Sequence, residues 1–125
     1  MSIFMQKTSI FLEIAKPRII AELQRAKAER QLSDIAQNTG INNSRLTEFL
    51  NGKRELSLYY LAKFIQGRTM SIEQILQKTR IEDLPIEDQR FIFRIDGQDD
   101  ETVNLLMEAK RQGVDYKTVL KAIVK

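Results

Sequence analysis

The fold is decided by the stretch Ile35-Ala36-Gln37-Asn38-Thr39-Gly40-Ile41-Asn42-Asn43-Ser44-Arg45-Leu46-Thr47-Glu48-Phe49-Leu50-Asn51-Gly52. Apolar residues recur at i, i+3 and i+4 on both sides of Gly40, and this spacing predicts two short helices. Gly40 suits a tight turn with positive φ, and Ala36 is small enough to let the helices cross closely. The stretch therefore predicts a helix-turn-helix from about Leu32 to Asn51.

The flanking residues predict further short helices, which bring the total before residue 78 to four or five. Ser9 is a candidate cap for a helix that stops before Pro17, and Pro17 suits the first turn of a new helix. The Ile3-Phe4-Met5 and Ile10-Phe11-Leu12 clusters fit either a helix or a strand. Ser57 starts a helix that Gly67 ends, and Ser71-Ile72-Glu73-Gln74 has the form of a capping box. We expect residues 1–77 to form one domain.

The stretch from Ile35 to Gly52, followed by Lys53-Arg54 and the Ser57 helix, resembles the helix-turn-helix of lambda-repressor/Cro/CII-like phage regulators. The likeness covers about residues 17–76 and implies a five-helix DNA-binding domain that acts as a dimer. Gln31 departs from the family's Ser or Thr cap, which leaves the phosphate contact expected there open. An ordinary corner between two helices of a bundle is the alternative.

The resemblance implies two sets of DNA contacts. Base edges would be met by Asn42, Asn43, Ser44, Arg45, Thr47 and Glu48, and phosphates by Asn51, Lys53 and Arg54. Asn and Arg can pair bidentately with adenine and guanine in the major groove, and a Thr methyl can touch thymine. Glu48 could accept a hydrogen bond from cytosine, but its simpler role is to pair with Arg45 or to stay solvated.

Residues 78–125 predict a second module. Residues 78–89 are acidic, contain a proline and predict a linker, and Arg90-Phe91-Ile92-Phe93-Arg94-Ile95 predicts a strand because β-branched and aromatic residues alternate in it. Helices are expected over 102–112 and 115–124. The segment 90–125 resembles the ribbon-helix-helix fold of Arc-, MetJ- and CopG-type repressors, which implies a strand-helix-helix dimerisation module.

That second resemblance implies that Arg90, Ile92 and Arg94 point outward from a two-stranded ribbon, with Lys117 near phosphate. Ile92 at the central outward position and the acidic Asp96, Asp99, Asp100 and Asp115 argue against DNA reading, so dimerisation is the safer inference. An α+β appendage, with the strand paired to an N-terminal segment of the same chain, is the alternative.

Composition narrows the function classes. The 125 residues contain no Cys and no His, which removes most metal ligands, disulfides, thiol nucleophiles and the commonest general base. Residues 1–76 carry eleven Lys and Arg against seven Asp and Glu (+4), and residues 77–125 carry nine against ten (−1). The positive excess lies where a phosphate backbone would bind. No apolar run reaches the roughly 18 residues of a membrane span, so we expect a cytoplasmic protein.

The expectation is a mainly α protein that binds double-stranded DNA as a homodimer paired through its C-terminal strand and helices. We expect a phage- or plasmid-type transcriptional repressor with a palindromic operator, no cofactor and no enzymatic activity. The alternative is an antitoxin-like protein that neutralises a toxin partner and regulates its own operon. The linker carboxylates Glu82, Asp83, Glu87 and Asp88 offer almost no support for an enzyme.

Overall fold

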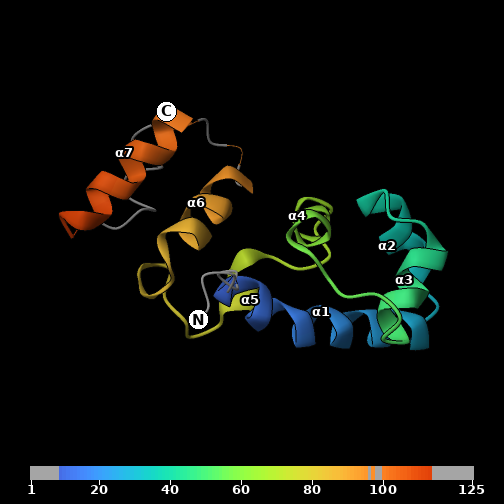
Figure 1. Cartoon of the computed structure of the whole chain (residues 1–125). Coiled ribbons are helices and arrows are strands. Elements are labelled where there is room, and N and C mark those ends of the chain that lie inside the picture. The colour runs from blue at the N-terminus through green and yellow to red at the C-terminus, as the bar shows by residue number, and fades with distance from the viewer. Residues whose placement is uncertain (1–8, 96, 98–99, 114–125) are drawn as a thin grey trace, which may run out of the picture. The chain divides into compact units, whose positions relative to one another are not determined.

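The computed structural model of the protein describes residues 9–95, 97 and 100–113, and these residues are mainly helical and contain no strand. The expectation of a mainly α protein is confirmed. The chain divides into two compact units, residues 1–79 and 80–125. The first contains α1 (Ile10–Ala28), α2 (Leu32–Thr39), α3 (Asn43–Leu50), α4 (Leu58–Gln66) and α5 (Ile72–Leu76) (Figure 1). The second contains the 3-10 turn η1 (Ile81–Asp83), α6 (Ile86–Ile95) and α7 (Asp100–Arg111).

Helix α1 is one continuous helix, whereas the sequence predicted two helices separated at Pro17. Ser9 caps it as expected, because the Ser9 hydroxyl accepts a hydrogen bond from the Leu12 N–H at 3.0 Å. Pro17 has no N–H for the carbonyl one turn earlier in the helix, but it is exposed, so water can solvate that carbonyl. The Ile10-Phe11-Leu12 cluster is helical, which removes it as a strand partner.

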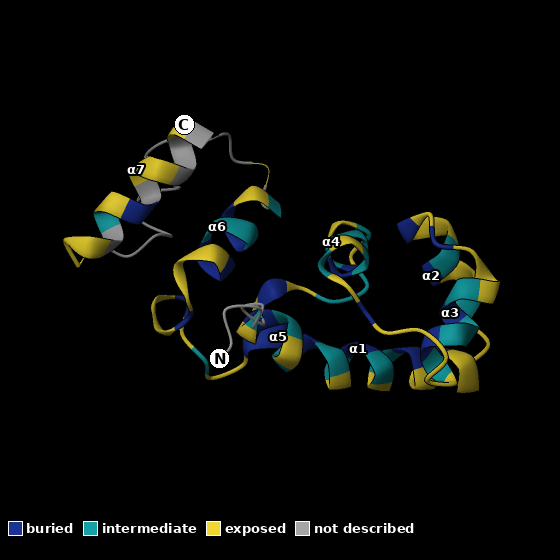
Figure 2. Ribbon diagram, in the orientation of Figure 1, coloured by how far each residue is buried: buried dark blue, intermediate teal, exposed yellow. Residues whose placement is uncertain are grey.

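The core of the first unit is built on the apolar stripe of α1, defined by five residues with no exposed surface. These residues are Phe11, Ala15, Ile19, Leu23 and Ala26. Helix α1 contacts each of the other four helices of the unit, and each of those helices carries buried residues (Figure 2). Arg18 adds a polar link to α5, because its Nε donates to the Ile75 carbonyl at 2.6 Å.

The second unit corrects the predicted strand at residues 90–95. These residues belong to α6, and its buried positions are Asp88, Gln89, Ile92 and Phe93, which follow a helical and not an alternating period. Ile92, which we expected to point outward from a ribbon, has no exposed surface. Helix α6 packs against α7. The predicted helix over 115–124 lies outside the described residues.

The predicted linker over 78–89 contains regular structure. It includes η1 and the first turn of α6, and the Leu84 carbonyl accepts a hydrogen bond from Nε2 of buried Gln89 at 2.8 Å. Pro85-Ile86-Glu87-Asp88 is a helix-start pattern, because Pro lacks the N–H that stays unpaired there and carboxylates favour the helix N-terminus. None of the described helices combines the length and the apolar content needed to cross a bilayer.

Gly67 provides a test of the packing of α4 against α2. Its φ of −81° suits any residue, but an added Cβ would lie 2.7 Å from the Asn38 carbonyl oxygen and 2.8 Å from Cγ2 of Thr39. We expect Gly67→Ala to lower the free energy of unfolding by about 1–3 kcal/mol, the usual cost of overpacking. Urea unfolding followed by circular dichroism measures it. The exposed neighbour is the control: Gln66→Ala should stay within about 0.5 kcal/mol. Equal midpoints for both variants would contradict this close approach.

Candidate nucleic-acid interface

The turn between α2 and α3 is held by buried Thr39 and by Gly40. The Thr39 hydroxyl donates to the Ile35 carbonyl at 2.7 Å and accepts from the Ile41 N–H at 3.1 Å. Gly40 has a φ of 75°, the left-handed conformation that suits the end of α2. The sequence indicated the role of Gly40 but not the two hydrogen bonds of Thr39, which is one of the few buried polar residues described.

Helix α3 has a buried apolar face and an exposed polar face. Leu46 and Phe49 are buried, and the Phe49 ring meets the rings of Tyr60 and Phe64 edge to face, with centroids 5.2 and 6.1 Å apart. Asn43 and Ser44 are exposed at the start of the helix. The helix therefore presents its first turn outward from a fixed apolar base.

Two of the predicted base-reading side chains, Asn42 and Thr47, each make a hydrogen bond to the backbone of α3. The Asn42 side-chain oxygen accepts from the Arg45 N–H at 2.8 Å and so caps α3. The Thr47 hydroxyl donates to the Asn43 carbonyl at 2.9 Å, which leaves its methyl group for contact. Asn43 and Ser44 carry no such side-chain hydrogen bond among the described residues. These two are the least committed groups of the helix.

Glu48 pairs with two arginines, one on its own helix and one after it. A Glu48 carboxylate oxygen lies 3.0 Å from Nε of Arg45 and 3.0 Å from Nε of Arg54. Arg45 also donates to the Tyr60 hydroxyl and lies over the Tyr60 ring, 5.5 Å from its centroid. Of the two simpler roles expected for Glu48, the pairing with Arg45 is present, and we call these four side chains the Glu48 network. Each of the two arginines is thus held in place by contacts on its own molecule.

The residues predicted to touch phosphate follow α3 directly. Asn51, Lys53 and Arg54 are all exposed. Gly52, between them, has a φ of 71°, and the Asn51 N–H donates to the Thr47 carbonyl at 2.9 Å. The polar end of α3 is therefore continuous with a cationic loop.

Helix α4 adds three residues that the sequence analysis did not single out. Tyr59, Tyr60 and Lys63 line a shallow pocket of about 160 Å³ together with Arg45 and the turn residues Gly40, Ile41 and Asn42. Tyr59 is 65% exposed, and Nζ of Lys63 lies over its ring at 5.0 Å. Aromatic and basic residues spaced one helical turn apart were the available signal. We call this the turn pocket.

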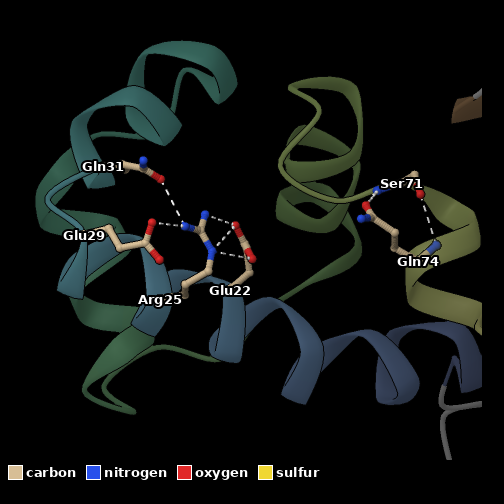
Figure 3. Close-up of polar contacts among 6 residues, drawn as sticks. All are labelled: Glu22, Arg25, Glu29, Gln31, Ser71 and Gln74. Atoms are coloured by element: carbon tan, nitrogen blue, oxygen red, sulfur yellow. Dashed lines mark hydrogen bonds and ion pairs between the residues drawn. The ribbon is translucent and has the colours of Figure 1, made fainter.

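The start of α2 differs from the pattern of the family that the sequence resembles. Gln31 occupies the cap position and makes no side-chain cap bond. Its Oε1 accepts from Arg25 at 3.1 Å instead, and Arg25 also pairs with Glu22 and Glu29 (Figure 3). By contrast, Ser71 and Gln74 form the predicted capping box at α5 (Figure 3). A phosphate contact through Gln31 would use its Nε2 donor, because the Oε1 that Arg25 engages is an acceptor, like a phosphate oxygen.

The predicted contacts of the C-terminal module lie in the second unit. Arg90 is half-buried and donates to the Asn104 side-chain oxygen at 3.4 Å, and Arg94 is exposed near the end of α6. Ile92 is buried, which removes it as a surface contact. Lys117 lies outside the described residues. The ribbon surface predicted from residues 90–95 is absent because these residues are helical.

Neither a scan of protein-family models nor searches among curated proteins and solved structures finds a match for the chain. The residues that the structure describes contain no cluster of three or more acidic side chains placed to hold a metal ion.

Glu48 offers a pH-dependent test of its network. The hydrogen bond from Arg54, followed by the nearby charges of both arginines, holds the pKa of Glu48 below its ordinary value. We expect Arg54→Gln to raise that pKa more than Arg45→Gln does, as followed by NMR titration of the carboxyl carbon. Lys53→Gln removes the same charge from the same loop and is the control.

The sign of the stability effect follows from this shift. Because the folded-state pKa is depressed, the stabilisation from ionised Glu48 is present above the unfolded pKa and is lost as the pH falls through the folded one. An equal rise of the Glu48 pKa in the Lys53→Gln control would contradict the pairing.

Proposed function

We propose that the protein is a sequence-specific DNA-binding transcriptional regulator that reads the major groove with α3. The observation that carries this proposal is the exposed first turn of α3, fixed by buried Leu46 and Phe49 and followed by a cationic loop. An α-helix fits the major groove, and amide and hydroxyl groups on it can pair with base edges. Asn43 and Ser44 are the leading base-reading residues because their side chains are exposed and uncommitted.

The charge distribution supports a polyanionic partner for the first unit. Residues 1–76 carry eleven Lys and Arg against seven Asp and Glu, a net charge of +4. Residues 77–125 carry nine Lys and Arg against ten Asp and Glu, a net charge of −1. Lys53 and Arg54 are exposed beside α3, where they would lie close to the phosphate backbone. Binding to DNA should therefore weaken as salt rises.

We propose in addition that two chains bind a palindromic operator. One eight-residue reading helix covers only a few base pairs, so two copies would be needed for a site of useful specificity. The second unit is the candidate for pairing, because its two described helices are short and leave Ile86 and Leu105 about half exposed. The outcome at the promoter is proposed to be repression. The antitoxin alternative rested on the resemblance of residues 90–125 to ribbon-helix-helix proteins. Because residues 90–95 are helical, no observation favours that alternative.

Two substitutions separate base reading from phosphate binding. We expect Asn43→Ala to reduce the discrimination between the operator and single-base variants by about 1–3 kcal/mol, the value of one good base contact. Lys53→Ala should weaken binding to all sequences alike. Selection from random duplexes at low salt defines the operator. Fluorescence anisotropy then measures the affinity of both variants for the operator and for its single-base variants.

The control for this pair is Glu73→Ala, an exposed change on α5 that should leave both affinity and discrimination unchanged. If selection yields no preferred sequence, or if Asn43→Ala weakens all duplexes equally, α3 is not the reading element.

The stoichiometry of the complex tests the dimer. We expect two chains on each selected duplex, with half-sites about one helical turn apart, roughly 34–36 Å. Native mass spectrometry of the full-length protein on the selected DNA measures this. A single chain on a site without two-fold symmetry would contradict the dimer and leave base reading by α3 untouched.

A further inference from the structure

We propose that the turn pocket binds a phosphate group of the DNA backbone, with Lys63 and Tyr59 of α4 as its contacts. This inference rests on the proposed function and adds phosphate contacts from α4 to those expected from α3 and its following loop. The pocket lies between the α2–α3 turn and the exposed side of α4, so it borders the residues that begin the reading helix.

The charge of the pocket favours an anion. Its lining contains two cations, Arg45 and Lys63, and no carboxylate. Arg45 is already matched by Glu48, which is not a lining residue. Lys63 has only the Tyr59 ring as a partner among the described residues, and no described carboxylate pairs with it. One positive charge of this pocket is therefore left without a counter-charge.

The remaining lining groups can hydrogen-bond an anion. Tyr59 is 65% exposed and lies edge to face with Tyr60, with ring centroids 5.1 Å apart. Tyrosine hydroxyls, lysines and backbone N–H groups are the usual phosphate partners in protein–DNA complexes. The cation–π contact keeps the Lys63 ammonium beside the Tyr59 ring, so both donors are held near the same opening.

The size of the pocket favours one phosphate group over a whole nucleotide. Its volume of about 160 Å³ is close to the roughly 150 Å³ of a cavity that accommodates a single benzene ring. A phosphodiester group fits such a space, while a whole nucleotide would extend through its open side. The backbone of DNA lying against α3 supplies phosphates along this edge, and free nucleotide is the competing source.

Salt dependence of DNA binding is the direct test, because each lost phosphate contact lowers its slope. We expect Lys63→Ala to reduce the slope of log affinity against log salt by about 0.9 and to weaken all sequences alike. Lys63→Arg should restore the slope, and Tyr59→Phe should weaken binding while preserving the slope. Lys78→Ala, an exposed lysine after α5, is the matched control and should change nothing.

The source of the phosphate is decided by NMR on the full-length protein. Duplex DNA should shift the Tyr59 and Lys63 side-chain resonances at micromolar concentration, and deoxyadenosine monophosphate should not shift them even at millimolar concentration. Saturable shifts with the monophosphate would overturn the assignment to backbone. The unaltered protein could bind DNA with a salt slope that Lys53→Ala lowers and Lys63→Ala does not. That result would overturn the phosphate site in the turn pocket and leave the proposed function standing. If the unaltered protein binds no DNA, the proposed function fails first.

Discussion

The first unit depends on the apolar stripe of α1, because α2, α3, α4 and α5 all contact that one helix. Helices of five to nine residues are too short to be stable alone, so they form where they can bury a face. The five stripe residues have no exposed surface, and the short helices complete their burial. The outward direction of Asn43 and Ser44 follows from this, since α3 must turn Leu46 and Phe49 inward.

The polar surface of α3 combines committed and uncommitted groups. Arg45 and Arg54 share the Glu48 carboxylate, and Arg45 also contacts Tyr60. Such contacts limit the conformations of long side chains and reduce the free positive charge at the surface. A DNA-binding surface arranged in this way would favour shape and base contacts over indiscriminate attraction to phosphate.

Residues 86–95 illustrate where pattern reading fails. The run Phe91-Ile92-Phe93 is β-branched and aromatic, and a short apolar run of this kind fits a buried strand or a buried helix equally well. The preceding Pro85-Ile86-Glu87-Asp88 is a helix start, and the spacing from Asp88 and Gln89 to Ile92 and Phe93 is helical.

At Pro17 the sequence predicted a break between two helices where the structure has one helix. A solvent-facing proline interrupts one hydrogen bond without ending a helix that is packed on both sides of it.

The sequence by itself determined the helix-turn-helix pattern, its Gly40 turn, the caps at Ser9 and Ser71 and the polar face of α3. These features depend on neighbours within four residues, which a single sequence displays directly. Only the tertiary structure decided the continuity of α1, the sharing of Glu48 between two arginines and the approach of α4 to the turn. The continuity of α1 and the approach of α4 depend on contacts between residues distant in the chain, and the second partner of Glu48 depends on the path of the loop after α3. Local propensity carries no information about which side chains meet there.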